Sequence, residues 1–169
     1  HVISGTVDDS GQNGLVSVLV SVQRNSDGQF WNGSSWGQGL VRLAPNGLAT
    51  WNLELLASRL NNGVTYLVSC HPEDAVGNVG NDQRQFVFDS EAPAFSFDPP
   101  VVNIGTGAQV DLLAGASAFD NVDDDVTAGI STTGVVDVNT IGDYSVTYSA
   151  TDSAGNVGSA QRLYRVGLI

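Results

Sequence analysis

The stretch DAVGNVG (Asp74–Gly80) recurs almost unchanged as DSAGNVG (Asp152–Gly158), 78 positions further along the chain (152 minus 74). The similarity extends without gaps into the flanking residues, since Tyr66 aligns with Tyr144 and Arg84 aligns with Arg162. A loop that closes a structural unit occurs once in every unit, so a repeat at this spacing counts the units. The sequence therefore predicts two units that end in the same hairpin.

The hydrophobic pattern around the repeat has a period of two residues, which is typical of half-buried antiparallel strands. The helical candidate ELLASRL (54–60) is short and predicts at most one turn of helix. Short strands separated by Gly, Asn and Asp turns favour an all-β fold of two tandem Ig-like antiparallel β-sandwiches, residues 1–89 and 90–169, joined near Pro93. The residues expected to share an apolar face are Val16, Val18, Val20 and Val22, then Ala49, Trp51, Leu53 and Leu55, and in the second unit Tyr144, Val146, Tyr148 and Ala150.

The repeated residues themselves have a structural explanation. An aspartate at the start of a hairpin loop accepts backbone N–H bonds, and the Gly-Asn pair that follows tolerates positive φ. Tyr66 and Tyr144 each precede the repeated aspartate by eight residues. This is the layout of a tyrosine corner, in which the hydroxyl bonds to backbone just upstream. We therefore interpret the repeat as part of the fold.

The charge of the chain is strongly acidic, with 18 acidic and 6 basic residues, all of the latter arginine, and a net charge of -12. Phosphate binding needs clustered cations, so this balance argues against nucleic acid and against an anionic membrane surface as partners. No apolar run reaches the roughly 18 residues of a membrane helix. The lone Cys70 alternates with Tyr66 and Val68 and is predicted to be buried. Methionine is absent even at position 1, which indicates a piece of a longer protein.

Three stretches of the second half, DNVDDDVT (120–127), GDYSVTYSATDSAGN (142–156) and LYRV (163–166), resemble the bacterial Ig-like module first recognised in pesticidal crystal proteins. The family usually has glycine where this chain has Asp124, a turn position that aspartate can also occupy. The first half is similar to Ig-like repeats of large bacterial surface proteins through ISGTVDDSG (3–11) and GVTYLVSCHPEDAVGN (63–78). The resemblance implies extracellular or cell-surface modules that extend, position or attach neighbouring domains of the same chain, and it does not imply catalysis.

The densest cluster of candidate metal ligands consists of four carboxylates within six residues: Asp120, Asp123, Asp124 and Asp125. Calcium binds six to eight hard oxygens, which closely spaced aspartates and loop carbonyls can supply. The alternative is that these aspartates accept N–H bonds within turns and face water. The spacing does not match an EF-hand.

Two thinner groups of acidic residues are also candidates for calcium. Asp8 and Asp9 are expected near Asp74 at one end of the first unit. The linker pair Asp89 and Glu91, within Asp-x-Glu-Ala-Pro, resembles the linkers of cadherin-like arrays, which implies an ion bound between modules. Bound calcium would rigidify the modules by neutralising crowded carboxylates.

The stretch FWNGSSW (30–36) carries Trp31 and Trp36 around a glycine-containing turn. Exposed indoles beside Asn and Ser suit stacking on a sugar ring. The alternative is a hairpin whose aromatic rings pack into the core. A sugar site requires both indoles to be exposed on one face.

Catalytic patterns are missing from the sequence: two histidines occur, His1 and His71, and no Ser/His/Asp arrangement, zinc spacing or phosphate loop accompanies them. We therefore predict a non-catalytic extracellular module, a spacer or stalk segment of a larger bacterial protein. The alternative functions are a carbohydrate-binding accessory module of an extracellular enzyme and a module that binds a protein ligand.

Overall fold

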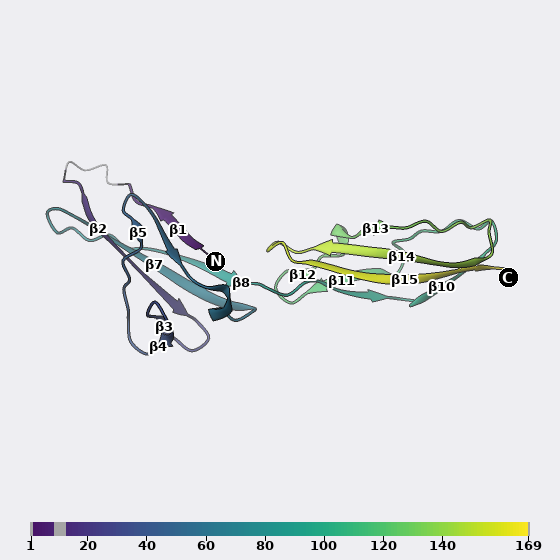
Figure 1. The fold of residues 1–169 in the computed structure, drawn as a ribbon, viewed down its shortest axis with the longest axis horizontal. Coiled ribbons are helices and arrows are strands. Elements are labelled where there is room, and N and C mark those ends of the chain that lie inside the picture. Colours follow the sequence, from purple (N-terminus) through teal and green to yellow (C-terminus); the bar gives the residue numbers. More distant parts are fainter. Residues whose placement is uncertain (1, 9–12, 169) are drawn as a thin grey trace. The chain divides into compact units, whose positions relative to one another are not determined.

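The computed structural model describes residues 2–8 and 13–168, which form two compact units, His1–Asp89 and Ser90–Ile169. Figure 1 shows that each unit is built from strands joined by loops, and the elements run from β1 to β8 in the first unit and from β9 to β15 in the second. The prediction of an all-β fold of two Ig-like sandwiches is confirmed. The helical candidate is one 3-10 turn, η1 (Ala57–Arg59), as expected.

The first unit contains two sheets. One has the order β1-β6-β5 and the other β4-β3-β2-β7-β8. All the described pairs in this unit are antiparallel. The strands are β1 (Val2–Thr6), β2 (Leu15–Arg24), β3 (Phe30–Trp31), β4 (Trp36–Gly37), β5 (Asn46–Gly47), β6 (Thr50–Glu54), β7 (Val64–Asp74) and β8 (Asp82–Phe88).

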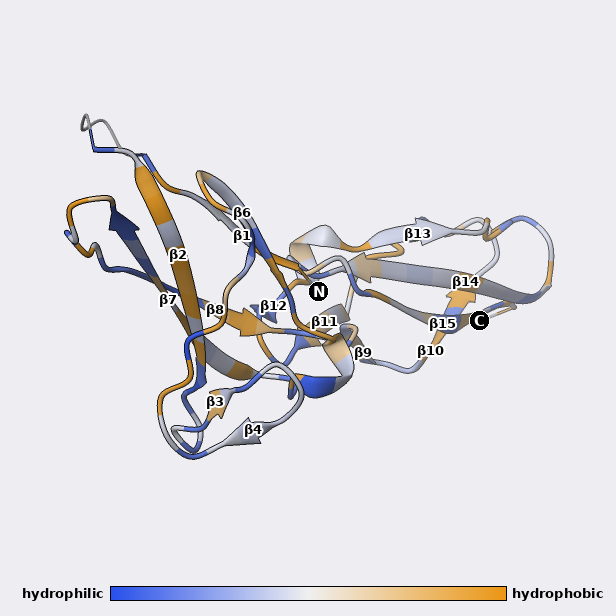
Figure 2. Cartoon of the chain, turned by 60° about the vertical axis from the view of Figure 1, so that its left-hand side comes forward, coloured by the Kyte–Doolittle hydropathy of each residue, from blue (hydrophilic) through white to orange (hydrophobic). Residues whose placement is uncertain are grey.

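The core of the first unit lies between these sheets. Val20, Val22 and Tyr66 from one sheet pack in the same cluster as Trp51 from the other sheet. Leu55 also belongs to this cluster. Figure 2 shows orange bands interrupted by paler ones along β2, the strand that contributes Val18, Val20 and Val22 to this core.

Val16 departs from the expected face, since it is 53% exposed while Val18, Val20 and Val22 are buried. The reason is a shift in the β2–β7 register between Leu15 and Ser17, which inserts an extra residue into the ladder. A β-bulge of this kind ends the strict alternation, so the expectation for Val16 was wrong.

The second unit also contains two sheets, of order β10-β15-β14-β13 and β12-β11-β9. The β10–β15 pair is parallel, because the chain crosses from the sheet of β9 to the other sheet and joins β15 in the same direction. Ile104, Val146 and Tyr148 are among the buried residues of its core. The elements are β9 (Ala94–Phe97), β10 (Val101–Gly105), β11 (Ala116–Asp120), β12 (Asp124–Asp125), η2 (Thr127–Gly129), β13 (Ser131–Thr133), β14 (Gly142–Thr151) and β15 (Val157–Gly167).

Both tyrosine corners are confirmed. The Tyr66 hydroxyl accepts a hydrogen bond from the backbone N–H of Asn61 at 2.7 Å. The Tyr144 hydroxyl donates to the carbonyl of Thr140 at 2.8 Å. Each bond ties the start of the final hairpin to the loop before it, so β7–β8 and β14–β15 are equivalent elements of the two units.

Candidate metal centre

Asp152 follows β14 and opens the final hairpin loop of the second unit. Its Oδ1 accepts from the backbone N–H of Asn156 and its Oδ2 accepts from the side-chain amide of Asn156, both at 2.8 Å. Gly155 has φ +93, which glycine adopts without strain. This network holds the Asp152 carboxylate in one orientation at the end of the sandwich.

The equivalent loop of the first unit has the same bonds, since Asp74 Oδ1 accepts from the backbone N–H of Asn78 and Asp74 Oδ2 accepts from its side-chain amide. The two loops differ in their surroundings. Asp152 is 7% exposed, whereas Asp74 is more exposed and lines a surface hollow with Asp8 and Glu73. The loop itself is therefore structural, and its environment distinguishes the second copy.

Asp120 is the last residue of β11 and is 8% exposed. Its Oδ1 accepts from the backbone N–H groups of Val122 at 2.8 Å and Asp123 at 3.1 Å. These bonds form the turn after β11 and fix the direction of the side chain.

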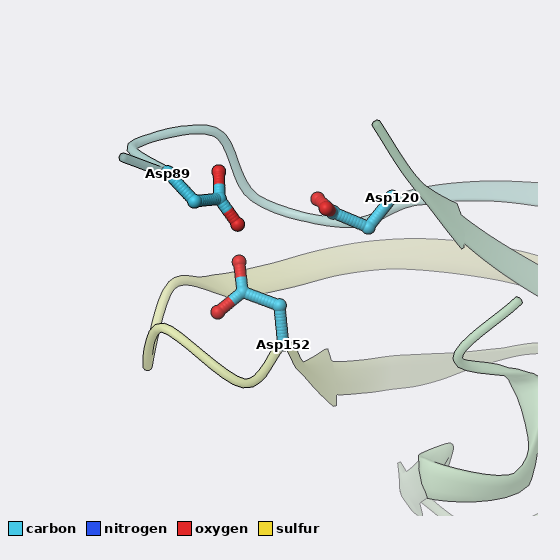
Figure 3. A group of neighbouring side chains, drawn as sticks. All are labelled: Asp89, Asp120 and Asp152. Atoms are coloured by element: carbon cyan, nitrogen blue, oxygen red, sulfur yellow. The ribbon is translucent and has the colours of Figure 1, made fainter. Parts of the chain in front are cut away.

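Asp89, Asp120 and Asp152 bring their carboxylates together. Each residue offers one oxygen, and these three oxygens all lie within 4.8 Å of one another. Figure 3 shows the three carboxylates turned toward a common point, from the segment that leads into the second unit, from the end of β11 and from the loop after β14. Among the residues that the structure describes, no other group of three or more such side chains lies as close.

One oxygen of this group is buried and has no hydrogen-bond donor: Oδ2 of Asp120 has no partner among the described residues. A buried charged oxygen without a partner is costly, because water no longer solvates it. Two unit negative charges 4.8 Å apart repel by roughly 3 kcal/mol at an effective dielectric constant of about 20. The arrangement therefore calls for a positive charge.

The charge state of Asp152 also favours a cation. Burial by itself raises the pKa of Asp152, but hydrogen bonds from Asn156 and from the backbone of Gly155 and Ala154 outweigh burial and hold that pKa below its usual value. Asp152 is thus a carboxylate at neutral pH. Carboxylate oxygens are the ligands that Ca²⁺ and Mg²⁺ prefer.

The other three aspartates of the predicted acidic cluster lie elsewhere. Asp123 accepts from the backbone N–H and the hydroxyl of Ser153. Asp124 occupies a turn with φ +58, the left-handed conformation that explains why glycine suits this position. Asp125 accepts from the backbone N–H of Thr127 at 2.9 Å, and the pKa of Asp125 is lowered chiefly by its interaction with that threonine. These residues shape the turn, and the structure brings only Asp120 into the group.

The two smaller groups of acidic candidates are also only partly brought together. Asp8 and Asp74 line one surface hollow, and a hydrogen bond from the Asn78 side chain is the main cause of the lowered pKa of Asp74. Asp9 lies outside the described residues. Asp89 belongs to the group of three, and Glu91, its expected partner, does not.

The two tryptophans of FWNGSSW do not form an exposed platform. Trp31 is 3% exposed and belongs to the core of the first unit. The Trp36 indole N–H donates to the carbonyl of Arg59 at 2.7 Å, and the guanidinium of Arg24 lies 4.9 Å from its ring centroid. The condition for stacking on a sugar is not met at this hairpin.

Sequence reasoning missed Asp152 as a candidate ligand because Asp152 was interpreted only as a structural residue of the repeated hairpin loop. The sequence does show acidic residues at the ends of several predicted strands. Asp120 and Asp152 are 32 residues apart in sequence (152 minus 120), so only knowledge of which strand ends meet in the sandwich would have brought them together.

Comparison with known proteins finds a similarity in the second unit. Residues 101–166 match the family model described as bacterial surface protein, Ig-like domain, so this part of the chain is similar to that family. The finer resemblance to pesticidal crystal proteins stays a prediction. A comparison with curated proteins finds no match.

Two solved structures from Clostridium perfringens ZmpB are similar to the chain. One holds CBM51-2 in complex with GlcNAc together with INT domains, at 24% identity over 46% of this chain and 17% of that one, with a TM-score of 0.42. The other holds the M60 catalytic domain with CBM51-1 and CBM51-2, at 18% identity over 90% of this chain and 15% of that one, with a TM-score of 0.44. The chain spans less than a fifth of either protein, and likeness at this level carries no argument about function.

Among the described residues, no helix has the length and apolar character needed to cross a membrane.

Proposed function

We propose that the chain is a non-catalytic spacer or stalk segment of a bacterial surface protein, in which a calcium ion bound by Asp89, Asp120 and Asp152 stiffens the entry to the second unit. The observation that carries the proposal is the buried, unpartnered Oδ2 of Asp120 beside two further carboxylates. The match of residues 101–166 to a bacterial surface Ig-like domain supports the assignment to a bacterial surface protein.

Calcium fits the group better than softer metals because all three protein ligands are carboxylate oxygens. Oxygens separated by up to 4.8 Å can share one Ca²⁺ ion, since its ligands lie on a shell about 4.6–5.2 Å across. Water or loop carbonyls would complete the six to eight ligands that calcium takes.

The three ligands come from separate parts of the chain, which explains how an ion would act mechanically. Asp89 directly precedes the second unit, Asp120 ends β11, and Asp152 follows β14. An ion held by all three ties the incoming segment to two turns of that unit. Since this set of ligands exists only in the folded chain, binding stabilises the fold by mass action.

Thermal unfolding with calcium and with chelator tests the proposal. We expect about 2 mM CaCl₂ to raise the unfolding midpoint of the second unit by about 8–15 °C, because an ion at 30–100 times its Kd stabilises a domain of this size by about 2 kcal/mol or more. All three tryptophans lie in the first unit, so their fluorescence follows that unit separately in the same sample.

The variant Asp120→Asn makes the test specific. Its amide keeps the acceptor for Val122 and Asp123 but removes the negative charge beside Asp152. We expect this variant to be at least as stable as the wild type in chelator and less stable in calcium, a crossover that a purely structural role does not produce.

The matched control is Asp125→Asn, which removes an exposed charge from the same turn and should keep the full calcium response. Calcium should also slow cleavage by a glutamate-specific protease after Glu91, two residues beyond Asp89. Equal midpoints of the wild type with calcium and with chelator would contradict the proposal.

A further inference from the structure

The first unit contains a groove that the function proposed above does not use. A cavity of about 550 Å³ opens between β1 and β8, and its floor includes Trp51, Val68 and Cys70. Residues 3–7 form one wall, and the other wall is formed by Asn81, Asp82, Arg84, Gln85 and Phe86. The two walls belong to different sheets, so the groove lies along one side of the sandwich.

Both walls are sheet edges. Within the described residues, β1 is the terminal strand of one sheet of this unit and β8 is the terminal strand of the other. An edge strand can accept another strand through its backbone. Several side chains that face the groove are apolar, among them Ile3, Trp51 and Phe86.

The second unit shows what covers the equivalent edge. Its final strand β15, the counterpart of β8, has β10 beside it in parallel, with Val102 opposite Tyr164 and Ile104 opposite Val166. The chain reaches β10 directly from β9, which pairs with β11 in the other sheet. Residues 94–105 thus close that side of the sandwich, and Phe95, Phe97, Val102 and Ile104 pack on its core.

Two arginines at equivalent positions of the repeat also indicate that the edge is covered in the second unit and open in the first. Arg162 is 1% exposed and donates to the carbonyl of Pro99 at 2.7 Å and 3.1 Å, and to the carbonyl of Ala114 at 2.6 Å. Pro99 lies between β9 and β10, so the buried arginine holds the covering segment. Arg84, its counterpart on β8, lines the groove and has a side chain 80% exposed, paired with the exposed Asp82.

We propose that this groove is a binding site for one extended β-strand that runs parallel to β8, has apolar side chains at alternate positions and offers a backbone carbonyl to Arg84. The occupant has the chemistry of residues 94–105 of the second unit. It buries the apolar floor, continues the sheet of β8, and covers the exposed Arg84, whose guanidinium otherwise bonds only at the surface, to Asp82 and to the carbonyl of the neighbouring Gln83 among the described residues.

Cys70 provides a direct measurement, because it is the only cysteine of the chain and lines the groove. Burial, with the nearby charge of Asp82, raises the pKa of the Cys70 thiol, so maleimide labelling is followed at about pH 8.5. A synthetic peptide of residues 94–107 is added to the full chain at up to about 1 mM, and the same peptide is also tethered to the N-terminus through a flexible linker, which raises its effective concentration.

We expect the free peptide to slow labelling about tenfold, as occupancy with a Kd near 0.1 mM requires, and the tethered peptide to slow it further. A peptide with Val102→Asp and Ile104→Asp should give no protection. Arg84→Ala should weaken the affinity for the peptide about tenfold, since a charge-assisted hydrogen bond is lost, and should thereby reduce the protection to about twofold. Arg165→Ala on β15 should leave the protection unchanged.

Unchanged labelling with both the free and the tethered peptide would overturn the proposal, as would equal protection by the aspartate-containing peptide. Protection that rises with the concentration of the chain alone would assign the groove to a second copy and also overturn it. Neither result depends on calcium, so failure here is distinct from failure of the metal site.

Discussion

Replacing Gly158 with alanine is expected to lower the free energy of unfolding of the second unit by about 3 kcal/mol, at the upper end of the range for overpacked sites. Gly158 is buried at the start of β15, opposite Ala150. A Cβ atom there would lie 2.1 Å from the carbonyl oxygen of Pro93 and 3.0 Å from its carbonyl carbon. Both contacts are with backbone, so relief requires the segment before β9 to move.

Chemical denaturation followed by near-UV circular dichroism measures this effect, because three of the four tyrosines, Tyr144, Tyr148 and Tyr164, lie in the second unit. Gly167→Ala is the matched control, since it lies at the other end of β15 and a Cβ there meets no atom within 4 Å. Equal stability of the two variants would show that the segment around Pro93 does not approach β15 as closely as described.

Replacing Arg162 with methionine is expected to destabilise the second unit by about 3 kcal/mol. Methionine keeps much of the aliphatic volume but leaves the carbonyls of Pro99 and Ala114 without their donor. A hydrogen bond that involves a charged group, such as the Arg162 guanidinium, contributes about 1.5–3 kcal/mol. The guanidinium also lies 5.5 Å from the Phe97 ring and 5.6 Å from the Tyr164 ring, and those contacts are lost as well.

The repeat supplies the control for this second change. Arg84→Met alters the aligned residue of the first unit. Its side chain is exposed, with a surface ion pair to Asp82 and a hydrogen bond to the neighbouring carbonyl of Gln83, so the stability of the first unit should change by less than about 0.5 kcal/mol. Denaturation of both variants, detected by tyrosine and by tryptophan signals, separates the units. Similar small losses for both would refute the role of Arg162 as the anchor of the covering segment.

Much of the fold was predictable because its signals are local. The period-two pattern identified the strands, and the repeated Tyr and Asp-x-x-Gly-Asn identified the final hairpins, whose hydrogen bonds span only a few residues. Val16 could not be placed, because the bulge that turns it outward depends on how β2 meets β7. The parallel pairing of β10 with β15 could not be predicted from the hydrophobic pattern either, since alternation within a strand does not show which strand lies beside it.

The candidate site was predictable only in part. Asp120 was singled out for its acidic neighbours Asp123, Asp124 and Asp125, but those three form hydrogen bonds or a turn conformation of their own. Asp89 was matched with Glu91, two residues further along the chain, and the structure groups it instead with Asp120 and Asp152.

The sequence by itself determined the number of units and the loops that end them, because turn conformations, tyrosine corners and strand alternation depend on residues close together in the chain. Only the tertiary structure decided which of two nearly identical loops places its aspartate beside two other carboxylates and which of two aligned arginines is buried. Asp152 and Arg162 differ from Asp74 and Arg84 through segments distant in sequence, Asp89 and Asp120 for the aspartate and residues 94–105 for the arginine. Burial and charge depend on what packs against a side chain, and local sequence does not record that contact.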